Sequence, residues 1–386
     1  MLGYIVAIGL ITVWYYICKN TGDKNHKSFL IGTAILMTLF YGLRGQDVGS
    51  DTVSYIAMFL EDGSVPLSGL WDYMWKEKSP AYVLLEWLFY QILPFPQLWL
   101  LATSAFFFFI FSNFIKKNSV DPYFSYLIFF TIFGTFQMTG IRQSCAMAVL
   151  MLAFEQIKEK RPVKYLLLIG LAYLFHKSSI VFLPFYIIGK RRITDLDIPI
   201  FTVGIVAIYA NRAFVFDLIK SFTSYNYFEQ LNHNEPVNFS IMIYGTTLLA
   251  LLLCVVLTSR KKRQLIEQYD LSQNANIYSY SKMRRLFQND LLRQEVRKDG
   301  ELSLYSQYAN AMILASLFMP LVAINGAVRR IVMYFALFMI LLLPKVFREF
   351  MDPQIRRVCK IILGVILTYL LLSGVKGSSY EYYLFF

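Results

Sequence analysis

The chain has 386 residues, of which 57% are hydrophobic and 17% aromatic, and its mean hydropathy is +0.49. These values lie above those of soluble globular domains, so the composition excludes that class and predicts a polytopic membrane protein. The formal net charge is +12, yet the basic residues stand in loops between apolar runs. Because such loops are normally cytoplasmic, membrane topology explains the charge and no nucleic-acid partner is predicted.

The first apolar run and the cysteines bear on processing and on metal binding. Lysines follow residues 1–18 rather than precede them, so we interpret the run as a retained first span with its N-terminus outside. Neither CxxC nor zinc spacing links the cysteines, which argues against a disulfide framework or a metal site. The cysteines are Cys18, Cys145, Cys254 and Cys359.

The apolar runs predict an all-α protein with about twelve spans in a single transmembrane domain, residues 1–386. The opposite parity would place several basic loops outside the cell, against the usual distribution of charge. The predicted spans are residues 1–18, 28–43, 97–115, 122–138, 140–157, 163–175, 178–189, 198–217, 239–258, 305–324, 331–346 and 361–372.

Residues 44–96 are predicted to form an outer loop with one short helix. The apolar run Ala81–Leu93 has 13 residues, which make about 20 Å of helix against about 30 Å of hydrocarbon to cross. The PFP that follows stops a helix. If the run crossed fully, Lys116 and Lys117 would lie outside, so we interpret it as a re-entrant or interfacial helix on the outer side.

Residues 259–304 form the largest predicted cytoplasmic loop and contain ten Lys or Arg. The stretch LFQNDLLRQEVRKDG is typical of an amphipathic helix that lies on anionic lipid. Charged anchoring explains the loop more simply than a regulatory or partner-binding role, which stays open. Residues 348–360 form a second basic cytoplasmic loop before the last span.

Residues 141–157 and 163–175 predict a helical hairpin with a cytoplasmic tip. Four basic residues separate the two runs, which places the tip inside. They are Lys158, Lys160, Arg161 and Lys164. The far ends of the hairpin carry Arg142 and His176, so the sequence predicts a cation and an imidazole side by side at the outer edge of the membrane. A charge near a bilayer costs about 2.5 to 3.5 kcal/mol on insertion scales, which makes it a functional hypothesis.

Under this topology charged residues from four separate places collect at the outer face, against the positive-inside rule. Guanidinium groups bind phosphates in bidentate geometry, so several of them together suggest an anionic ligand such as a lipid-linked pyrophosphate. An imidazole and a carboxylate supply acid/base capacity near neutral pH. The collected residues are Arg44, Asp47, Asp51, Arg142, His176, Lys177, Arg329 and Arg330.

Several members of this set also have a purely structural explanation. Asp51 and Tyr55 are four residues apart, so they can bond along a helix. His176 can cap a helix end, because Lys177 and two serines follow it as in an ordinary turn. Arg330 can extend toward the interface, and spacing alone does not decide between Arg329 and Arg330.

Four short blocks stand in order between about residues 40 and 340. Each block is weak alone, while the ordered set with matching topology is more specific. They are R-x-x-x-VG-x-D-[ST]-x-x-Y, seen as Arg44, Val48, Gly49, Asp51, Thr52 and Tyr55; IRQ-x-x-A, seen as Ile141, Arg142, Gln143 and Ala146; FH-x-S, seen as Phe175, His176 and Ser178 or Ser179; and Arg-Ile/Val-x-x-Tyr, seen as Arg330, Ile331 and Tyr334.

With these blocks the chain resembles the EpsG-type members of the Wzy-like polysaccharide polymerases, which are polytopic and GT-C-like. The resemblance implies a bacterial multi-pass enzyme that joins oligosaccharide repeat units carried on undecaprenyl pyrophosphate, at the outer face of the cytoplasmic membrane. The lipid-linked pyrophosphate is itself the activated donor, so no cofactor or metal is expected. The chain departs from the family before the partial helix, where KEKSPAY replaces an acidic residue beside Pro-Gly and leaves Glu77 as the acid.

The predicted mechanism gives these residues separate roles. Arg142, with Arg329 or Arg330, holds the donor pyrophosphate and stabilises the charge that develops as it leaves. Arg44 holds the acceptor pyrophosphate or orders the first loop. His176 or Asp51 takes the proton from the acceptor hydroxyl. The remaining predicted substrate-binding residues are Gln143, Asp47 and Tyr55.

Two other classes of membrane protein were weighed. A transporter or flippase of lipid-linked oligosaccharide also needs basic residues in an aqueous cavity, but it predicts mid-membrane charges and broken helices in related halves. An acyltransferase with His176 as base usually meets its acyl donor from the inside. The sugar, the linkage, the polymer and any partner protein that regulates chain length are left open by the sequence.

The topology generates a labelling prediction. Cysteines placed at Ser64 and Ser224 are expected to react from outside the cell, and cysteines at Ser119 and Ser281 are not, because the basic loops lie inside. The measurement is labelling of intact cells with a membrane-impermeant thiol reagent. Labelling at position 119 would show that Ala81–Leu93 crosses the membrane, and the predicted outer cluster would be lost.

Overall fold

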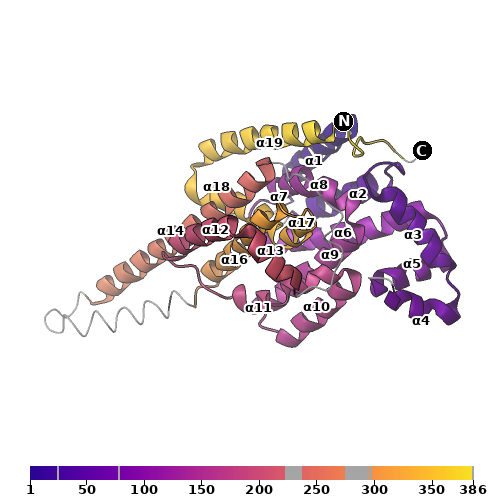
Figure 1. Cartoon of the computed structure of the whole chain (residues 1–386). Coiled ribbons are helices and arrows are strands. Elements are labelled where there is room, and N and C mark those ends of the chain that lie inside the picture. Colours follow the sequence, from indigo (N-terminus) through magenta and orange to yellow (C-terminus); the bar gives the residue numbers. More distant parts are fainter. Residues whose placement is uncertain (24–25, 77–78, 222–236, 274–294, 296–297, 385–386) are drawn as a thin grey trace. The chain divides into compact units, whose positions relative to one another are not determined.

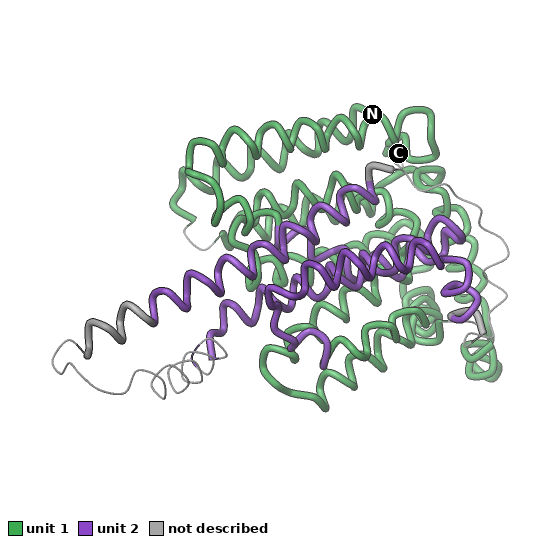
Figure 2. Tube along the Cα trace, turned by 60° about the vertical axis from the view of Figure 1, so that its left-hand side comes forward, with its two compact units in different colours: residues 1–186, 343–386 green, residues 187–342 purple. Residues whose placement is uncertain are grey.

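The computed structural model describes the chain except residues 24–25, 77–78, 222–236, 274–294, 296–297 and 385–386. Within that part the fold is helical (Figure 1), which confirms the predicted all-α class. The described residues contain no strand, only an isolated antiparallel bridge between Arg44 and Leu384. The chain divides into two compact units, residues 1–186 with 343–386 and residues 187–342 (Figure 2).

Unit 1 contains the helices on which most of the predicted site residues stand. Five of them begin with proline in the first turn, where the missing N–H costs nothing and the fixed φ suits a helix: α5, α6, α7, α10 and α19. The elements are α1 Leu2–Asn20, α2 Lys27–Gly42, α3 Thr52–Ser64, α4 Leu67–Lys76, α5 Pro80–Ile92, α6 Pro96–Asn118, α7 Pro122–Ile128, a π-helical turn Phe129–Phe133, α8 Gly134–Thr139, α9 Ile141–Lys158, α10 Pro162–Phe175, a 3-10 helix Lys177–Phe182 and α19 Pro353–Val375.

Unit 2 is built around three helices that pack in sequence order. α14 (Val237–Gln273) lies against α16 (Gly300–Val322), and α16 lies against α17 (Val328–Ala336). α12 (Asp197–Ala210) also packs on α16 and continues, after a bend of 83°, into α13 (Arg212–Ser221). α11 (Phe185–Ile188) and α18 (Met339–Phe350) connect the two units along the chain.

The predicted number of membrane spans is confirmed only in part. Four helices of the described chain are long and apolar enough to cross a membrane, or up to six if each bent pair is one span. The four are α1, α6, α14 and α19. The predicted count of about twelve is not confirmed, because α2 and α10 have only 16 and 14 residues and other runs are bent or broken. At 1.5 Å per residue, α10 covers about 21 Å.

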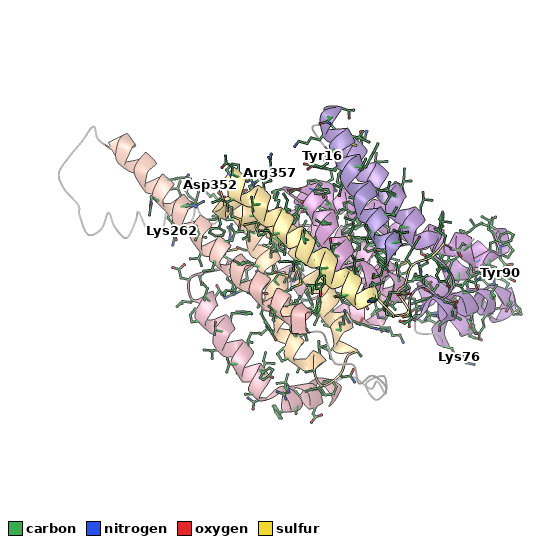
Figure 3. The ribbon with its side chains drawn as sticks, turned by 90° about the horizontal axis from the view of Figure 1, so that it is seen from above. Tyr16, Lys76, Tyr90, Lys262, Asp352 and Arg357 are labelled. Carbon is green, nitrogen blue, oxygen red and sulfur yellow. The ribbon has the colours of Figure 1, made fainter. Side chains whose placement is uncertain are left out.

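Two predicted loops differ from the structure in their extent. The prediction of a basic loop at residues 348–360 is wrong. α19 already begins at Pro353, and its exposed first turns carry basic residues. Asp352 and Arg357 lie at this end of α19 (Figure 3). Residues 44–96, predicted to hold one short helix, form α3, α4 and α5. α5 matches the predicted partial helix in its length of 13 residues.

Segments of unit 1 that were predicted to be cytoplasmic contact one another. The Lys158 ammonium donates to Asn118 Oδ1 over 2.9 Å and pairs with Glu155 at 3.1 Å. At the start of α7, Asp121 forms an ion pair with Lys360 of α19. These contacts join the basic ends of α6, α9 and α19 to acidic partners of the same unit.

At the opposite end of unit 1, residues 379–384 form what we call the C-terminal clasp. Its backbone carbonyls accept from the first outer loop: Gly45 N donates to Tyr383 O over 2.8 Å and Gly49 N to Ser379 O over 2.7 Å. The Tyr382 ring stacks on Phe40 with 4.1 Å between centroids. The ends of the chain therefore meet at the loop that follows α2 (Figure 1).

The clasp also touches two other segments that were predicted to lie outside. Tyr4 at the start of α1 donates its hydroxyl to Tyr380 O over 2.9 Å. The Tyr380 hydroxyl lies 3.5 Å from Thr139 Oγ1, just before α9. Segments predicted to share a side of the membrane thus contact each other at both ends of unit 1.

The clasp requires glycine at position 45, and this generates a stability prediction. A Cβ there would overlap the Tyr383 ring, so Gly45→Ala is expected to destabilise the protein by about 1 to 3 kcal/mol. The steric cost is expected to vanish in a Tyr383→Ala background, because contacting residues are not additive. The measurement is thermal unfolding in detergent.

Gly69→Ala in α4 is the matched control, since a Cβ at Gly69 meets nothing within 4 Å. If Gly45→Ala lowers the melting temperature equally with and without the Tyr383 ring, the steric account of the clasp fails.

Candidate functional site

Arg44 is a buried arginine, 1% exposed, at the end of α2. Its Nε donates to Val48 O and to Thr52 Oγ1, both at 3.2 Å. Its two terminal nitrogens donate to backbone carbonyls, one to Tyr41 O and the other, over 3.3 Å, to Met138 O. All three guanidinium nitrogens are therefore used inside the protein.

These bonds explain the residue types of the first sequence block. Gly49 has φ +97°, a left-handed conformation that favours glycine. A Cβ there would lie 2.9 Å from Thr52 Oγ1 and 3.0 Å from Met138 Cβ. Thr52 in turn donates to Val48 O over 2.6 Å. Of the two roles predicted for Arg44, the geometry favours the ordering of this loop over the binding of a substrate.

Burial lowers the pKa of Arg44 to about 10. The group nevertheless stays protonated at neutral pH. A buried cation is tolerated when its N–H groups are satisfied, and here carbonyl oxygens and a hydroxyl satisfy them.

The two candidate carboxylates of the loop lie in more open positions. Asp47 is exposed and accepts from the Tyr383 hydroxyl over 2.9 Å, a bond that raises the pKa of Tyr383. Asp51 is half-exposed at the start of α3 and accepts from Ser50 Oγ over 3.1 Å. The backbone N of Tyr55 donates to Asp51 O over 3.0 Å. Both carboxylates therefore remain within reach of a ligand.

Arg142 has a different environment from Arg44. It stands at the start of α9, with its guanidinium carbon 5.3 Å from the centre of the Tyr82 ring. One terminal nitrogen contacts Met58 Sδ at 2.7 Å, while Nε is buried and has no hydrogen-bond partner. No carboxylate of the described chain forms an ion pair with Arg142. Gln143, the next residue, is buried.

His176 lies at the end of α10, where the chain becomes extended before the 3-10 helix. Its backbone N donates to Ala172 O over 2.9 Å, and its side chain is half-buried. α9 packs against α10 and against the 3-10 helix, so the hairpin places Arg142 and His176 at the same end. Ser179, in the same block, is buried and its Oγ has no hydrogen-bond partner.

Two buried acids beside Arg142 were missed by the sequence analysis. Glu86 of α5 is 0% exposed and Asp62 of α3 is 2% exposed. Burial, and then hydrogen bonding to Asp62, raises the pKa of Glu86 well above its usual range, while Arg142 acts in the opposite direction. The signal was present in the sequence, since Glu86 is the only charged residue in the run Ala81–Leu93.

Arg329 and Arg330 stand in the first turn of α17, in unit 2. Arg329 lies over the Phe239 ring at 5.3 Å, and both arginines are half-exposed. Tyr334, from the same block, is buried. The choice between the two arginines, and their approach to Arg142, stay predictions.

Some of the residues singled out in the sequence lie outside the part of the chain that the structure describes. Glu77 lies outside the described residues, as does most of the basic loop 259–304, although α14 extends to Gln273. Among the residues that are described, no three His, Cys, Asp or Glu side chains form a group that could hold a metal ion.

The fold is that of a multi-pass helical membrane protein, and Arg44 and Arg142 both lie in its unit 1. The EpsG family model matches residues 27–385, nearly the whole chain. The chain therefore belongs to the EpsG family, whose members are polysaccharide polymerase-type membrane proteins. No curated protein and no solved structure matches it. The match begins after α1 and includes the C-terminal clasp.

Proposed function

We propose that the chain is a polymerase that joins lipid-linked oligosaccharide repeat units at the outer face of the bacterial cytoplasmic membrane. The observation that carries this is Arg142, a partly buried guanidinium whose Nε is unbonded and which forms no ion pair with the residues that the structure describes. A buried donor without a partner costs about 1 to 3 kcal/mol, so the site favours a ligand that supplies an acceptor. A pyrophosphate oxygen is such an acceptor.

Membership of the EpsG family suggests which anion Arg142 binds. The donor is a repeat unit on undecaprenyl pyrophosphate, and Arg142 stabilises the charge that develops on the pyrophosphate as it leaves. Gln143 and Tyr55 complete the part of the binding site that lies in unit 1 in this proposal. The activated donor requires neither metal nor cofactor, and the apolar spans position the two lipids so that the sugars meet.

The proton of the acceptor hydroxyl needs a base at the same end of unit 1. His176 is half-buried at the end of α10 and titrates near neutral pH in its unperturbed form. Asp51 is the alternative, half-exposed at the start of α3. We propose His176 as the base, because α9 and α10 pack together and hold it at the Arg142 end of the hairpin.

A transporter of lipid-linked oligosaccharide is the second candidate. One observation favours it, namely the 83° bend between α12 and α13, since broken helices line substrate sites in many transporters. A transporter moves its substrate without lengthening it, so one reconstituted assay separates the two functions.

The arginine is predicted to act as a planar phosphate ligand and not as a general positive charge. Arg142→Lys keeps the charge and loses the bidentate geometry, so we expect polymer formation to fall by at least about tenfold with normal expression. Arg212→Lys is the matched control, because Arg212 also stacks on a tyrosine, Tyr209, at 4.8 Å and is exposed. Wild-type polymer from Arg142→Lys would make Arg142 a helix-end anchor.

The purified protein in liposomes is expected to lengthen lipid-linked repeat units without nucleotide sugar or added metal. His176→Ala is expected to slow this step by about 10²- to 10⁴-fold, as for loss of a positioned base, while donor binding survives. The measurements are product length on gels and binding of labelled donor.

His26→Asn serves as the control histidine, because His26 has φ 53°, which asparagine tolerates. Normal lengthening by His176→Ala would move the base to Asp51, Asp47 or Glu77. Movement of labelled lipid across the bilayer with no lengthening would establish the transporter instead.

A further inference from the structure

Asp62 and Glu86 form a carboxyl pair inside the cluster of α3, α5, α6 and α9. One oxygen of each group has a clear donor: the Tyr73 hydroxyl donates to Asp62 Oδ1 over 2.8 Å, and Trp99 Nε1 donates to Glu86 Oε1 over 2.9 Å. Both side chains are almost completely buried. Nothing in the proposed reaction has yet used either acid.

The second oxygen of each carboxyl is the informative one. Asp62 Oδ2 and Glu86 Oε2 are buried and have no hydrogen-bond partner. The Tyr82 hydroxyl also interacts with the Glu86 carboxyl, where it favours the ionised form, but burial and Asp62 outweigh it. The two side chains nevertheless lie within hydrogen-bonding reach of each other. Two carboxylates only accept, so a bond between them requires one proton, and that single O–H provides a partner for both orphan oxygens.

We propose that Asp62 and Glu86 share one proton, and that this keeps the charge of Arg142 available to the anionic donor. The inference rests on the proposed function and adds two positioning residues to it. Two buried carboxyls side by side do not both ionise readily, because like charges at short range oppose it. With one proton present, the pair carries a single negative charge. This charge lies on Asp62, which accepts from Tyr73.

The second ionisation would change the site of Arg142. Arg142 interacts electrostatically with both Glu86 and Tyr82. A charged Glu86 would become an internal partner for the guanidinium and would compete with the pyrophosphate for it. Loss of the shared proton as the pH rises is therefore expected to weaken donor binding.

The other titratable groups on the surrounding helices were considered for the same pH range. α3 contributes Tyr55, α9 contributes Cys145 and α4 contributes Asp72 and Lys76 besides Tyr73. α6 faces the pair with Trp99, and its charged residues, Lys116 and Lys117, stand at its far end. α10 carries Lys164, Tyr165 and Tyr173 and is followed by His176. Glu86→Gln leaves all of these groups unchanged.

The test measures binding of a polyprenyl pyrophosphate to the full-length protein in detergent between about pH 6 and pH 9, a range that spans buried glutamate pKa values. For the wild type, Kd is expected to rise with pH by about 5- to 150-fold, the usual range of coupling between two sites. Glu86→Gln stays neutral at this position and still donates an N–H to Asp62. Its Kd is therefore expected to lose the pH dependence that comes from this pair. Titration of the probe itself affects both proteins equally.

Controls keep the outcomes distinct. Glu61→Gln changes an exposed neighbour and is expected to follow the wild type. If Glu86→Gln fails to fold, the infrared carboxylic-acid band of the wild type tests the shared proton, and this band is expected to shift in Asp62→Asn because Glu86 loses its anionic partner. Equal pH profiles for wild type and Glu86→Gln, or no such band, would overturn the proposal. Wild-type protein that binds as expected but never lengthens a lipid-linked glycan would refute only the proposed function.

Discussion

The buried guanidinium of Arg44 is the interaction on which unit 1 depends. A buried cation is stable only if its donors are bonded, and the oxygens that meet them come from α2, from the loop before α3 and from Met138 before α9. The same loop is bonded on its other side by the C-terminal clasp. One side chain thus holds together segments that are far apart in the sequence.

Arg44 and Arg142 show how one residue type serves two purposes. The nitrogens of Arg44 all bond to protein oxygens, so its charge is compensated by dipoles inside the structure. Arg142 rests on an aromatic ring and a thioether, neither of which neutralises it. The charge of Arg142 is therefore left available to a ligand, whereas that of Arg44 is used inside the protein.

Prolines in the sequence predicted the ends of α5 well, whereas contacts between distant segments could not be predicted. Pro80 and the PFP motif fix both ends of α5, so its length agrees with the prediction. α19 was placed too late, because its basic first turns look like a loop although Pro353 starts a helix there. Hydropathy counts apolar runs and does not detect bends, so the helices of the described chain confirm only part of the predicted number of spans. The role of Arg44 in the loop and the Asp62–Glu86 pair required contacts between distant helices.

The contacts of the clasp can form only late in the synthesis of the chain. Residues 44–49 leave the ribosome long before residues 379–384, and until the latter arrive the loop lacks the carbonyls that Gly45 and Gly49 bond to. A nascent or prematurely terminated chain therefore has an unfinished outer loop, even when its early helices are already inserted.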